Sequence, residues 1–205
     1  TNPIRKLPYS TPSYKVENGK TLLETPEGDM PIEVFGAHNL NNLAGAKWIC
    51  QNMGVDEADF YEAIASFKGA SKRLEKIAEG NGKVAYKDFA HSPSKVAATT
   101  KAVKEQYPNR TLIACLELHT YSSLNAEFLK EYEGALEHAD VAVVFYSPDA
   151  VKIKQLEEVS YEQIATAFNK KDLIIYTNPT EFKEYLFGLK FDNSALLLML
   201  SLIHI

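Results

Sequence analysis

The sequence has few of the features that mark specialised protein classes. Only two of its 205 residues are cysteine. Cys50 and Cys115 both stand among apolar neighbours, so we expect buried free thiols rather than a disulfide scaffold. The formal net charge of -5 leaves no basic field for binding a nucleic acid. No signal peptide precedes Pro3, and the apolar run at 194–205 is too short to span a bilayer. These absences predict a cytoplasmic protein with neither a nucleic-acid nor a membrane partner.

Several catalytic motifs are also missing. Neither Gly-x-Ser-x-Gly nor His-Glu-x-x-His occurs, and the five histidines are not at metal-ligand spacing, so we expect no metal ligands in this chain. Gly19-Lys20-Thr21 resembles the end of a phosphate-binding loop, but Tyr14 stands where that loop needs a glycine. Gly80 and Gly82 imitate a dinucleotide fingerprint, but a strand follows them where a helix should begin. The chain is therefore expected to lack a phosphate loop of its own.

The first 70 residues carry a pattern of strands followed by helices. Three short runs, separated by the hairpin signal Asn18-Gly19 and the turn Glu27-Gly28, predict strands. These runs are residues 14–16, 21–23 and 32–35. Helical spacing covers 39–53, and Asp56 is expected to cap a second helix. The apolar positions of that second helix are Phe60, Ile64 and Phe67.

From Val84 onward, short apolar runs alternate with helical patterns. This rhythm predicts an α/β fold with a doubly wound, mostly parallel sheet. The expected strands are residues 84–89, 111–116, 141–145, 173–176 and 195–198. The expected helices start near Pro93, Ser123, Tyr161 and Pro179. A Gly-containing polar link at 69–71 predicts a domain boundary, and the hairpins and two helices before it look like the edge of a larger domain.

Two polar segments stand out against this background. The first, Phe35–Asn42, ends a strand and opens a helix, so its carboxamides could pair with an adenine edge or could simply cap the helix. The second, Tyr86–Pro93, lies at the carboxyl end of the first strand of the α/β unit, where such sheets bind ligands. There Asp88 could accept hydrogen bonds from ribose hydroxyls. The alternative is that Asp88, His91 and Ser92 only shape the turn.

Together with Phe67–Glu75, these two segments resemble the Mur ligase family, which joins amino acids or peptides to UDP-muramoyl precursors. Family members carry Gly-x-His-Asn-x-x-Asn at a helix start, then Phe-x-Gly followed by Arg-x-Glu, then Asp-Tyr-Ala-His-x-Pro at a strand-to-helix turn. The chain has all three in this order, with Phe89 in place of the tyrosine and Lys87 in place of the usual acidic neighbour of Asp88. The resemblance spans 31–199.

Within the family, the chain looks most like the murein peptide ligase type, which attaches a murein tripeptide to UDP-N-acetylmuramate in peptidoglycan recycling. In alanine-adding relatives the segment matching 119–123 reads His-Arg-Tyr-Thr-Arg, and its arginines suit the carboxylate of a free amino acid. Thr120 and Ser123 replace both arginines here, and no cation follows before Lys130. The implied partners are therefore two small molecules, UDP-N-acetylmuramate and the tripeptide L-alanyl-γ-D-glutamyl-meso-diaminopimelate.

The resemblance also implies roles for individual residues. The nucleotide-binding set is His38, Asn39, Asn42, Asp88 and His91. The first three would line the adenine pocket, the aspartate would reach the ribose, and His91 would lie beside the nucleotide. Arg73 would be catalytic, stabilising the transferring phosphoryl group, and His119 with Tyr121 would face the incoming amine. The implied chemistry is ATP-dependent formation of an acyl phosphate that the amine attacks, with Mg²⁺ neutralising the phosphates.

The resemblance makes residues 1–70 the incomplete C-terminal part of the central ATP-binding domain, and 71–205 the C-terminal α/β domain. The phosphate loop, most Mg²⁺ ligands and the UDP-binding domain would lie upstream, so the isolated chain is expected to be inactive. Other ligases of the superfamily, of alanine-adding, folylpolyglutamate or cyanophycin type, are alternatives, as is a non-catalytic nucleotide-binding or interaction module. Family members usually turn at Ser-Gly-Asn after Met199, whereas 200–205 continue apolar, and His204 is assigned no role.

Overall fold

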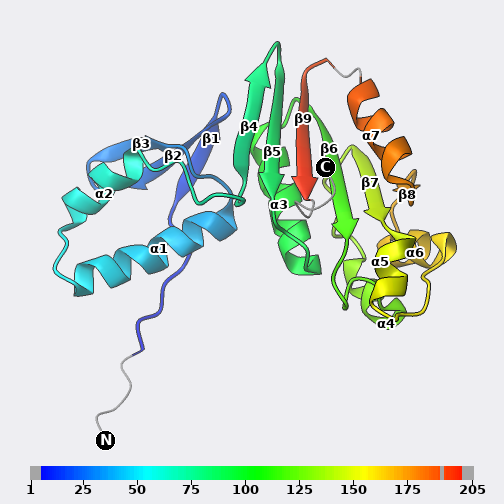
Figure 1. The fold of residues 1–205 in the computed structure, drawn as a ribbon. Helices are drawn as coiled ribbons and strands as arrows, with labels where there is room; N and C mark the ends of the chain where they lie inside the picture. The colour runs from blue at the N-terminus through cyan, green and yellow to red at the C-terminus, as the bar shows by residue number, and fades with distance from the viewer. Residues whose placement is uncertain (1–5, 190–191, 200–205) are drawn as a thin grey trace, which may run out of the picture. The chain divides into compact units, whose positions relative to one another are not determined.

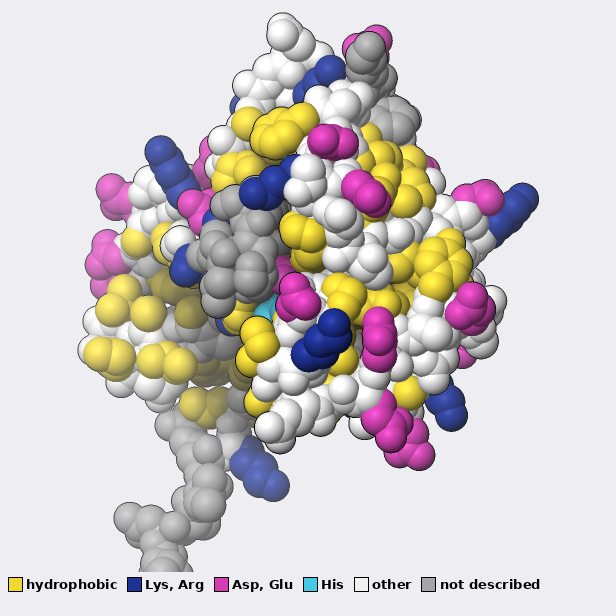
Figure 2. Space-filling model, turned by 45° about the vertical axis from the view of Figure 1, so that its right-hand side comes forward, with side chains coloured by type: hydrophobic (Ala, Val, Ile, Leu, Met, Phe, Trp, Pro, Cys, Tyr) yellow, Lys and Arg dark blue, Asp and Glu magenta, His cyan; other side chains and the backbone are white. Residues whose placement is uncertain are grey.

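The computed structural model describes residues 6–189 and 192–199. The departure from the family pattern at 200–205, including His204, lies outside the described residues. The chain divides into two compact units, Thr1–Gly69 and Ala70–Ile205. No helix in the described part of the chain is long and apolar enough to cross a membrane. On the face shown in Figure 2, lysine and arginine side chains are dispersed among acidic and hydrophobic ones.

The first unit is a three-stranded antiparallel sheet with two helices (Figure 1). Its elements are β1 (Tyr14–Glu17), β2 (Lys20–Thr25), β3 (Gly28–Ile32), α1 (Ala37–Asn52) and α2 (Glu57–Ala65). Asn18 and Gly19 both have positive φ, 51° and 75°, as a tight hairpin turn requires. Leu23 and Ile32 of the sheet share a core with Leu40 of α1 and Phe60 of α2. The helices are therefore held by apolar burial against one face of the sheet.

Three expectations for this unit are corrected. The third strand ends at Ile32 instead of continuing to Phe35, because the chain turns there toward Gly36, which has a φ of 86°. Asp56 occupies the N-cap position of α2, but its side chain makes no capping hydrogen bond. Phe67 lies beyond the end of α2 and is 46% exposed, so it is not a core residue of that helix.

The second unit is an α/β fold with a six-stranded sheet in the order β4-β5-β9-β6-β7-β8 (Figure 1). Five strands are parallel and β4 is antiparallel to β5, which confirms the predicted mostly parallel sheet. The strands are β4 (Glu75–Gly80), β5 (Lys83–Asp88), β6 (Thr111–Leu118), β7 (Val141–Tyr146), β8 (Ile174–Tyr176) and β9 (Ser194–Met199). The helical elements are α3 (Pro93–Gln106), α4 (Ala126–Leu129), the 3₁₀ turn η1 (Lys130–Tyr132), α5 (Pro148–Ile153), α6 (Tyr161–Phe168) and α7 (Pro179–Gly188).

Helices lie on both sides of this sheet. Phe182 of α7 packs with Ile113, Cys115 and Phe145, which point to one face of β6 and β7. Figure 1 shows α3 on the opposite side of the sheet, where it packs near β6 and β9 and buries residues such as Val96. The central strands are consequently buried on both faces, as their continuous apolar runs predict.

Three elements of this unit escaped the sequence prediction, and one was misplaced. β4, α5 and the 3₁₀ turn η1 were not predicted, and the helix expected near Ser123 is the short α4, which begins at Ala126 behind the cap Asn125. Cys115 is buried as expected, whereas Cys50 is only half-buried, and both thiols are free.

Candidate functional site

Asp88 ends β5 and is only 4% exposed. Its Oδ2 accepts a hydrogen bond from Leu74 N at 2.7 Å, and its Oδ1 accepts one from Ala90 N at 2.6 Å. Both oxygens therefore serve backbone amides, which gives the carboxylate the turn-shaping role considered as the alternative from the sequence. A hydrogen bond from a ribose hydroxyl to this carboxylate stays a prediction.

The loop that carries Arg73 is fastened to this same turn. Leu74 N donates to Asp88, and Phe89 N donates to Lys72 O at 3.0 Å, so both neighbours of Arg73 are bonded to the end of β5. Lys72 and Leu74 have positive φ values of 60° and 45°, a conformation that favours glycine and needs such support. The result is an exposed arginine on a braced turn.

Glu75 adds a second brace to the arginine loop. Its Oε2 accepts from Lys72 N at 2.8 Å and from Ser71 Oγ at 3.3 Å. The hydrogen bond from Lys72 N is the largest influence that lowers the pKa of Glu75, with Ser71 contributing as well. The Arg-x-Glu spacing thus has a local structural reason, because the glutamate closes the turn that presents the arginine.

Two histidines and one phenylalanine meet beside the ends of β5 and β6. The ring centroids of Phe89 and His91 are 5.2 Å apart, and His119 lies 6.0 Å from each of these two rings. His91 Nδ1 contacts Phe89 O at 2.9 Å, and His119 Nδ1 contacts Glu117 O at 3.2 Å. Because a carbonyl can only accept, Nδ1 carries the proton in each neutral ring, which leaves both Nε2 atoms as acceptors.

A buried tyrosine holds the backbone at His91. The hydroxyl of Tyr132, a fully buried residue, donates a short hydrogen bond to His91 O. Burial raises the pKa of Tyr132 to about 12, so the phenol stays a donor throughout the physiological range. The structure therefore fixes His91 through both its ring and its backbone.

The loop after β6 satisfies its own hydroxyl groups. Thr120 Oγ1 donates to Ser123 Oγ at 2.9 Å, Thr120 N donates to the same Ser123 oxygen at 2.9 Å, and Ser123 N donates to Thr120 Oγ1 at 3.1 Å. Ser123 is only 1% exposed. Tyr121, between them, is 63% exposed. Thr120 and Ser123 therefore shape the loop, while the Tyr121 side chain between them is exposed to solvent.

The start of α1 carries the remaining candidates, in the first unit. Gly36 is the N-cap and provides no side-chain cap. Asn39 Nδ2 donates to Phe35 O at 3.0 Å, so this carboxamide braces the strand-to-helix turn instead of capping helix amides. Asn42 is exposed, and within the described residues its side chain makes no hydrogen bond, while His38 is half-buried. Of the three predicted side chains at this helix start, Asn42 is thus the exposed one.

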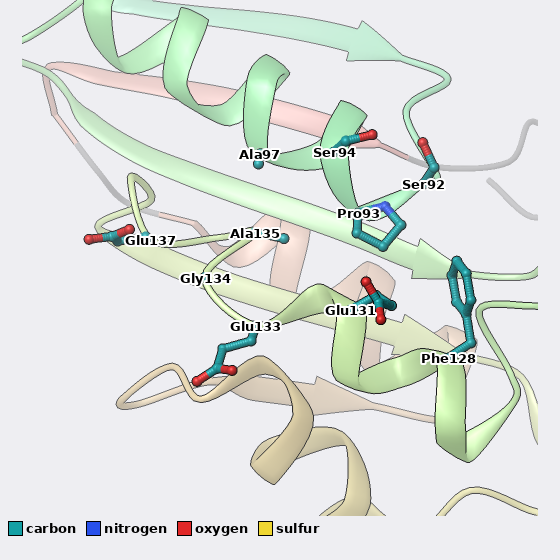
Figure 3. Close-up of a pocket in the computed structure, with 10 residues that line it drawn as sticks. All are labelled: Ser92, Pro93, Ser94, Ala97, Phe128, Glu131, Glu133, Gly134, Ala135 and Glu137. Carbon is teal, nitrogen blue, oxygen red and sulfur yellow. The ribbon is translucent and has the colours of Figure 1, made fainter.

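A groove of about 690 Å³ lies beside the start of α3 (Figure 3). Pro93 of α3 and Glu131 of η1 lie on opposite sides of it, and Glu133 and Glu137 stand farther along the same crossover. Neither His91 nor His119 lines it. Because three carboxylates border the groove, it does not suit the phosphates of a nucleotide.

The structure therefore assembles part of the predicted site. Within the second unit, the Arg73 loop joins Asp88, and His91 joins His119, all near the carboxyl ends of β5 and β6. His38, Asn39 and Asn42 lie in the first unit, at the start of α1. No group of three or more His, Cys, Asp or Glu side chains suited to a metal occurs among residues 6–189 and 192–199. Sequence reasoning missed the contacts of Phe89 and His91 with His119, which only the strand order reveals.

Comparison with known proteins identifies the class of protein. Residues 72–199 match the family model described as Mur ligase, glutamate ligase domain. The chain belongs to the Mur ligase family, whose members are ATP-dependent amide ligases. The resemblance seen in the sequence is confirmed.

Individual relatives agree with this assignment. The UDP-N-acetylmuramate–L-alanine ligase of Lactococcus lactis subsp. cremoris is 27% identical over 148 residues, which are 72% of this chain and 33% of that protein. Among solved structures, the UDP-N-acetylmuramate–alanine ligase of Thermotoga maritima has a TM-score of 0.70 at 17% identity, covering 95% of this chain and 43% of that one. A murein peptide ligase from Psychrobacter arcticus has a TM-score of 0.57 at 18% identity, covering 89% and 38%. The chain spans about a third of the length of the curated relatives it matches.

Proposed function

We propose that the chain is part of an ATP-dependent ligase that joins a murein tripeptide to UDP-N-acetylmuramate through an acyl phosphate, in peptidoglycan recycling. Residues 1–70 would be the end of its central ATP-binding domain and 71–205 its C-terminal domain. The observation that carries the ligase proposal is the braced turn that holds Arg73 exposed beside the end of β5. Arginine suits a transferring phosphoryl group, because its planar fork of N–H donors matches the equatorial oxygens.

The remaining residues would have the following parts in this ligase. Asn42, with His38 and Asn39 nearby, would hold the adenine, and His91 would lie beside the nucleotide. His119 and Tyr121 would face the incoming amine. Bound Mg²⁺ would supply charge neutralisation at the phosphates, through ligands mostly outside this chain. Catalysis would then depend on positioning and charge stabilisation more than on covalent participation of the protein.

The choice of a peptide over free L-alanine is supported by the loop after β6. Thr120 and Ser123 bond to one another, and no lysine or arginine occurs in 119–129. A free amino acid carries its carboxylate next to the reacting amine, so it needs a cation within this loop itself, as the arginines of alanine-adding relatives would provide. L-alanine addition remains the second candidate, because the relative from Lactococcus lactis is named for that activity.

The test is an assay of the full-length protein that carries this chain. ATP, Mg²⁺ and UDP-N-acetylmuramate are supplied with the tripeptide, L-alanine or L-glutamate, and the ligated product and ADP are both quantified. We expect ligation of the tripeptide in preference to L-alanine, and loss of most activity in an Arg73→Ala variant. Preference for L-alanine would contradict the peptide assignment, and no ligation of any amine would contradict the ligase itself. For residues 1–205 alone, we expect negligible ATP turnover.

A further inference from the structure

The loops after β6 and β7 emerge side by side at one edge of the sheet. Leu118 and Tyr146 end these two strands and are direct partners in the parallel ladder (Figure 1). His119 and Tyr121 follow the first strand, and α5 follows the second. Ligands of open α/β sheets bind outside this carboxyl edge, so a residue in either loop can reach a substrate bound there.

A lysine from the second loop lies on the tyrosine of the first. Lys154, the C-cap residue of α5, places its Nζ 4.3 Å from the centroid of the Tyr121 ring. The ring is 63% exposed, and the lysine is half-buried. An ammonium group over an aromatic face is held by the ring quadrupole while its N–H groups remain able to donate.

This lysine is uncommitted among the described residues. No salt bridge or side-chain hydrogen bond within 6–189 and 192–199 involves Lys154. By contrast, Lys104 and Lys170 bond to acceptors on the loop before β7. The hydroxyls of Thr120 and Ser123 are occupied within their own loop. Lys154 is therefore a group beside the 119–124 loop whose charge is available to an anion.

We propose that Lys154, held on Tyr121, binds a carboxylate of the amine substrate and so selects a peptide whose carboxylate lies at least one residue beyond the reacting amine. This inference rests on the proposed ligase function and deepens it. The cation comes from the end of α5, whereas His119 belongs to the loop after β6. Lys154 meets that loop at Tyr121, two positions after His119. A free amino acid has no carboxylate that is separated from its amine in this way.

The test compares substrates that differ only in this charge. The full-length protein is assayed with the murein tripeptide, with the same tripeptide whose carboxylates are converted to carboxamides, and with L-alanine. We expect Lys154→Met to raise the KM for the tripeptide about tenfold and to leave kcat within about twofold. The reason is that a contact remote from the reacting amine contributes equally to the ground state and the transition state. The ratio of kcat/KM for the tripeptide to kcat/KM for its amide should fall by the same factor.

Matched variants make the result specific. Lys152→Met removes an exposed lysine of the same helix that does not lie on Tyr121, and it should leave both constants unchanged. Lys154→Arg should retain the preference for the free carboxylate, and Tyr121→Phe, which keeps the ring, should retain it too, whereas Tyr121→Ala should reduce it. Circular dichroism spectra of all variants should coincide.

The outcomes separate the two proposals. If the wild type ligates the tripeptide but Lys154→Met behaves like Lys152→Met, the lysine proposal is overturned and the ligase function stands. If the wild type ligates only L-alanine, the peptide assignment and the lysine proposal both fall. A selective rise in KM for the free tripeptide, absent for its amide, supports both.

Discussion

Removal of the Asp88 carboxylate tests whether this residue braces the arginine loop. In Asp88→Ala, the backbone amides of Leu74 and Ala90 lose their acceptors. The site is buried, because Asp88 is 4% exposed, Leu74 7% and Ala90 2%. A buried amide left without a partner costs about 1–3 kcal/mol, and hydrogen bonds to a charged acceptor lie at the upper end. Two such losses predict a decrease of about 4 kcal/mol in the free energy of unfolding.

The measurement is urea unfolding of the 205-residue chain followed by far-ultraviolet circular dichroism, together with hydrogen exchange of the Leu74 and Ala90 amides. Circular dichroism is preferred to tryptophan fluorescence because the single tryptophan, Trp48, belongs to the other unit. We expect an earlier unfolding midpoint and faster exchange at both amides. Glu75→Gln is the control, because Glu75 also accepts a backbone amide of this turn but is only half-buried, and glutamine keeps an acceptor oxygen, so little change is expected.

Unchanged exchange at Leu74 and Ala90 in Asp88→Ala would refute the reasoning. The turn would then be held by other contacts, and the main role of the carboxylate would be the ribose contact that the family resemblance implies. A variant with native stability but a raised KM for ATP in the full-length protein would point to the same conclusion.

Two further predictions concern side chains away from the site. A thiol reagent should modify Cys50 in the native chain and Cys115 only after unfolding. The reason is that burial removes the Cys115 thiol from solvent and raises its pKa to about 12. Rapid modification of both cysteines in the native chain would contradict this. Burial alone raises the pKa of Asp140, but hydrogen bonds from Lys104 Nζ and Leu112 N outweigh it and hold the pKa below the ordinary 3.8. Its stabilising contribution is therefore full above that ordinary value and is lost as the pH falls through the lower folded-state pKa. Acid titrations of unfolding should show a smaller pH dependence in Asp140→Asn, by less than about 1 kcal/mol since the side chain is 44% exposed.

The extent to which the fold followed from the sequence depended on burial. The strands β6, β7 and β9 are apolar because both faces of the sheet are covered, so their runs stand out. β4 escaped prediction because it is an edge strand, exposed at five of its six positions, and so has no apolar alternation. Its turn was visible, since Asn81 and Gly82 have φ values of 50° and 74° and repeat the Asn-Gly signal used correctly at Asn18-Gly19. The prediction weighed only Gly80 and Gly82 of this turn, as an incomplete dinucleotide fingerprint, and did not use the Asn81-Gly82 signal.

The site was predictable as a set of motifs but not as a set of contacts. Phe89 and His119 come from β5 and β6, which are not neighbours, because β9 lies between them and comes last in the sequence. Lys154 reaches Tyr121 only because β6 and β7 end at the same level. No local pattern encodes such pairings, since they depend on strand order and register.

The β4–β5 hairpin explains why the motifs that carry Arg73 and Asp88, fifteen positions apart, belong to one structural unit. β4 runs antiparallel to β5, with Glu75 opposite Lys87, so the residues just before β4 return to the end of β5. Leu74 and Lys72 then bond to Asp88 and Phe89, and Arg73 is held between those bonds. On this geometry Asp88 acts through Arg73 as a positioning residue, and the effects of Arg73→Ala and Asp88→Asn on kcat should not add in the full-length protein. The double variant should be no slower than Arg73→Ala alone, and full additivity would instead assign Asp88 an independent contact with the nucleotide.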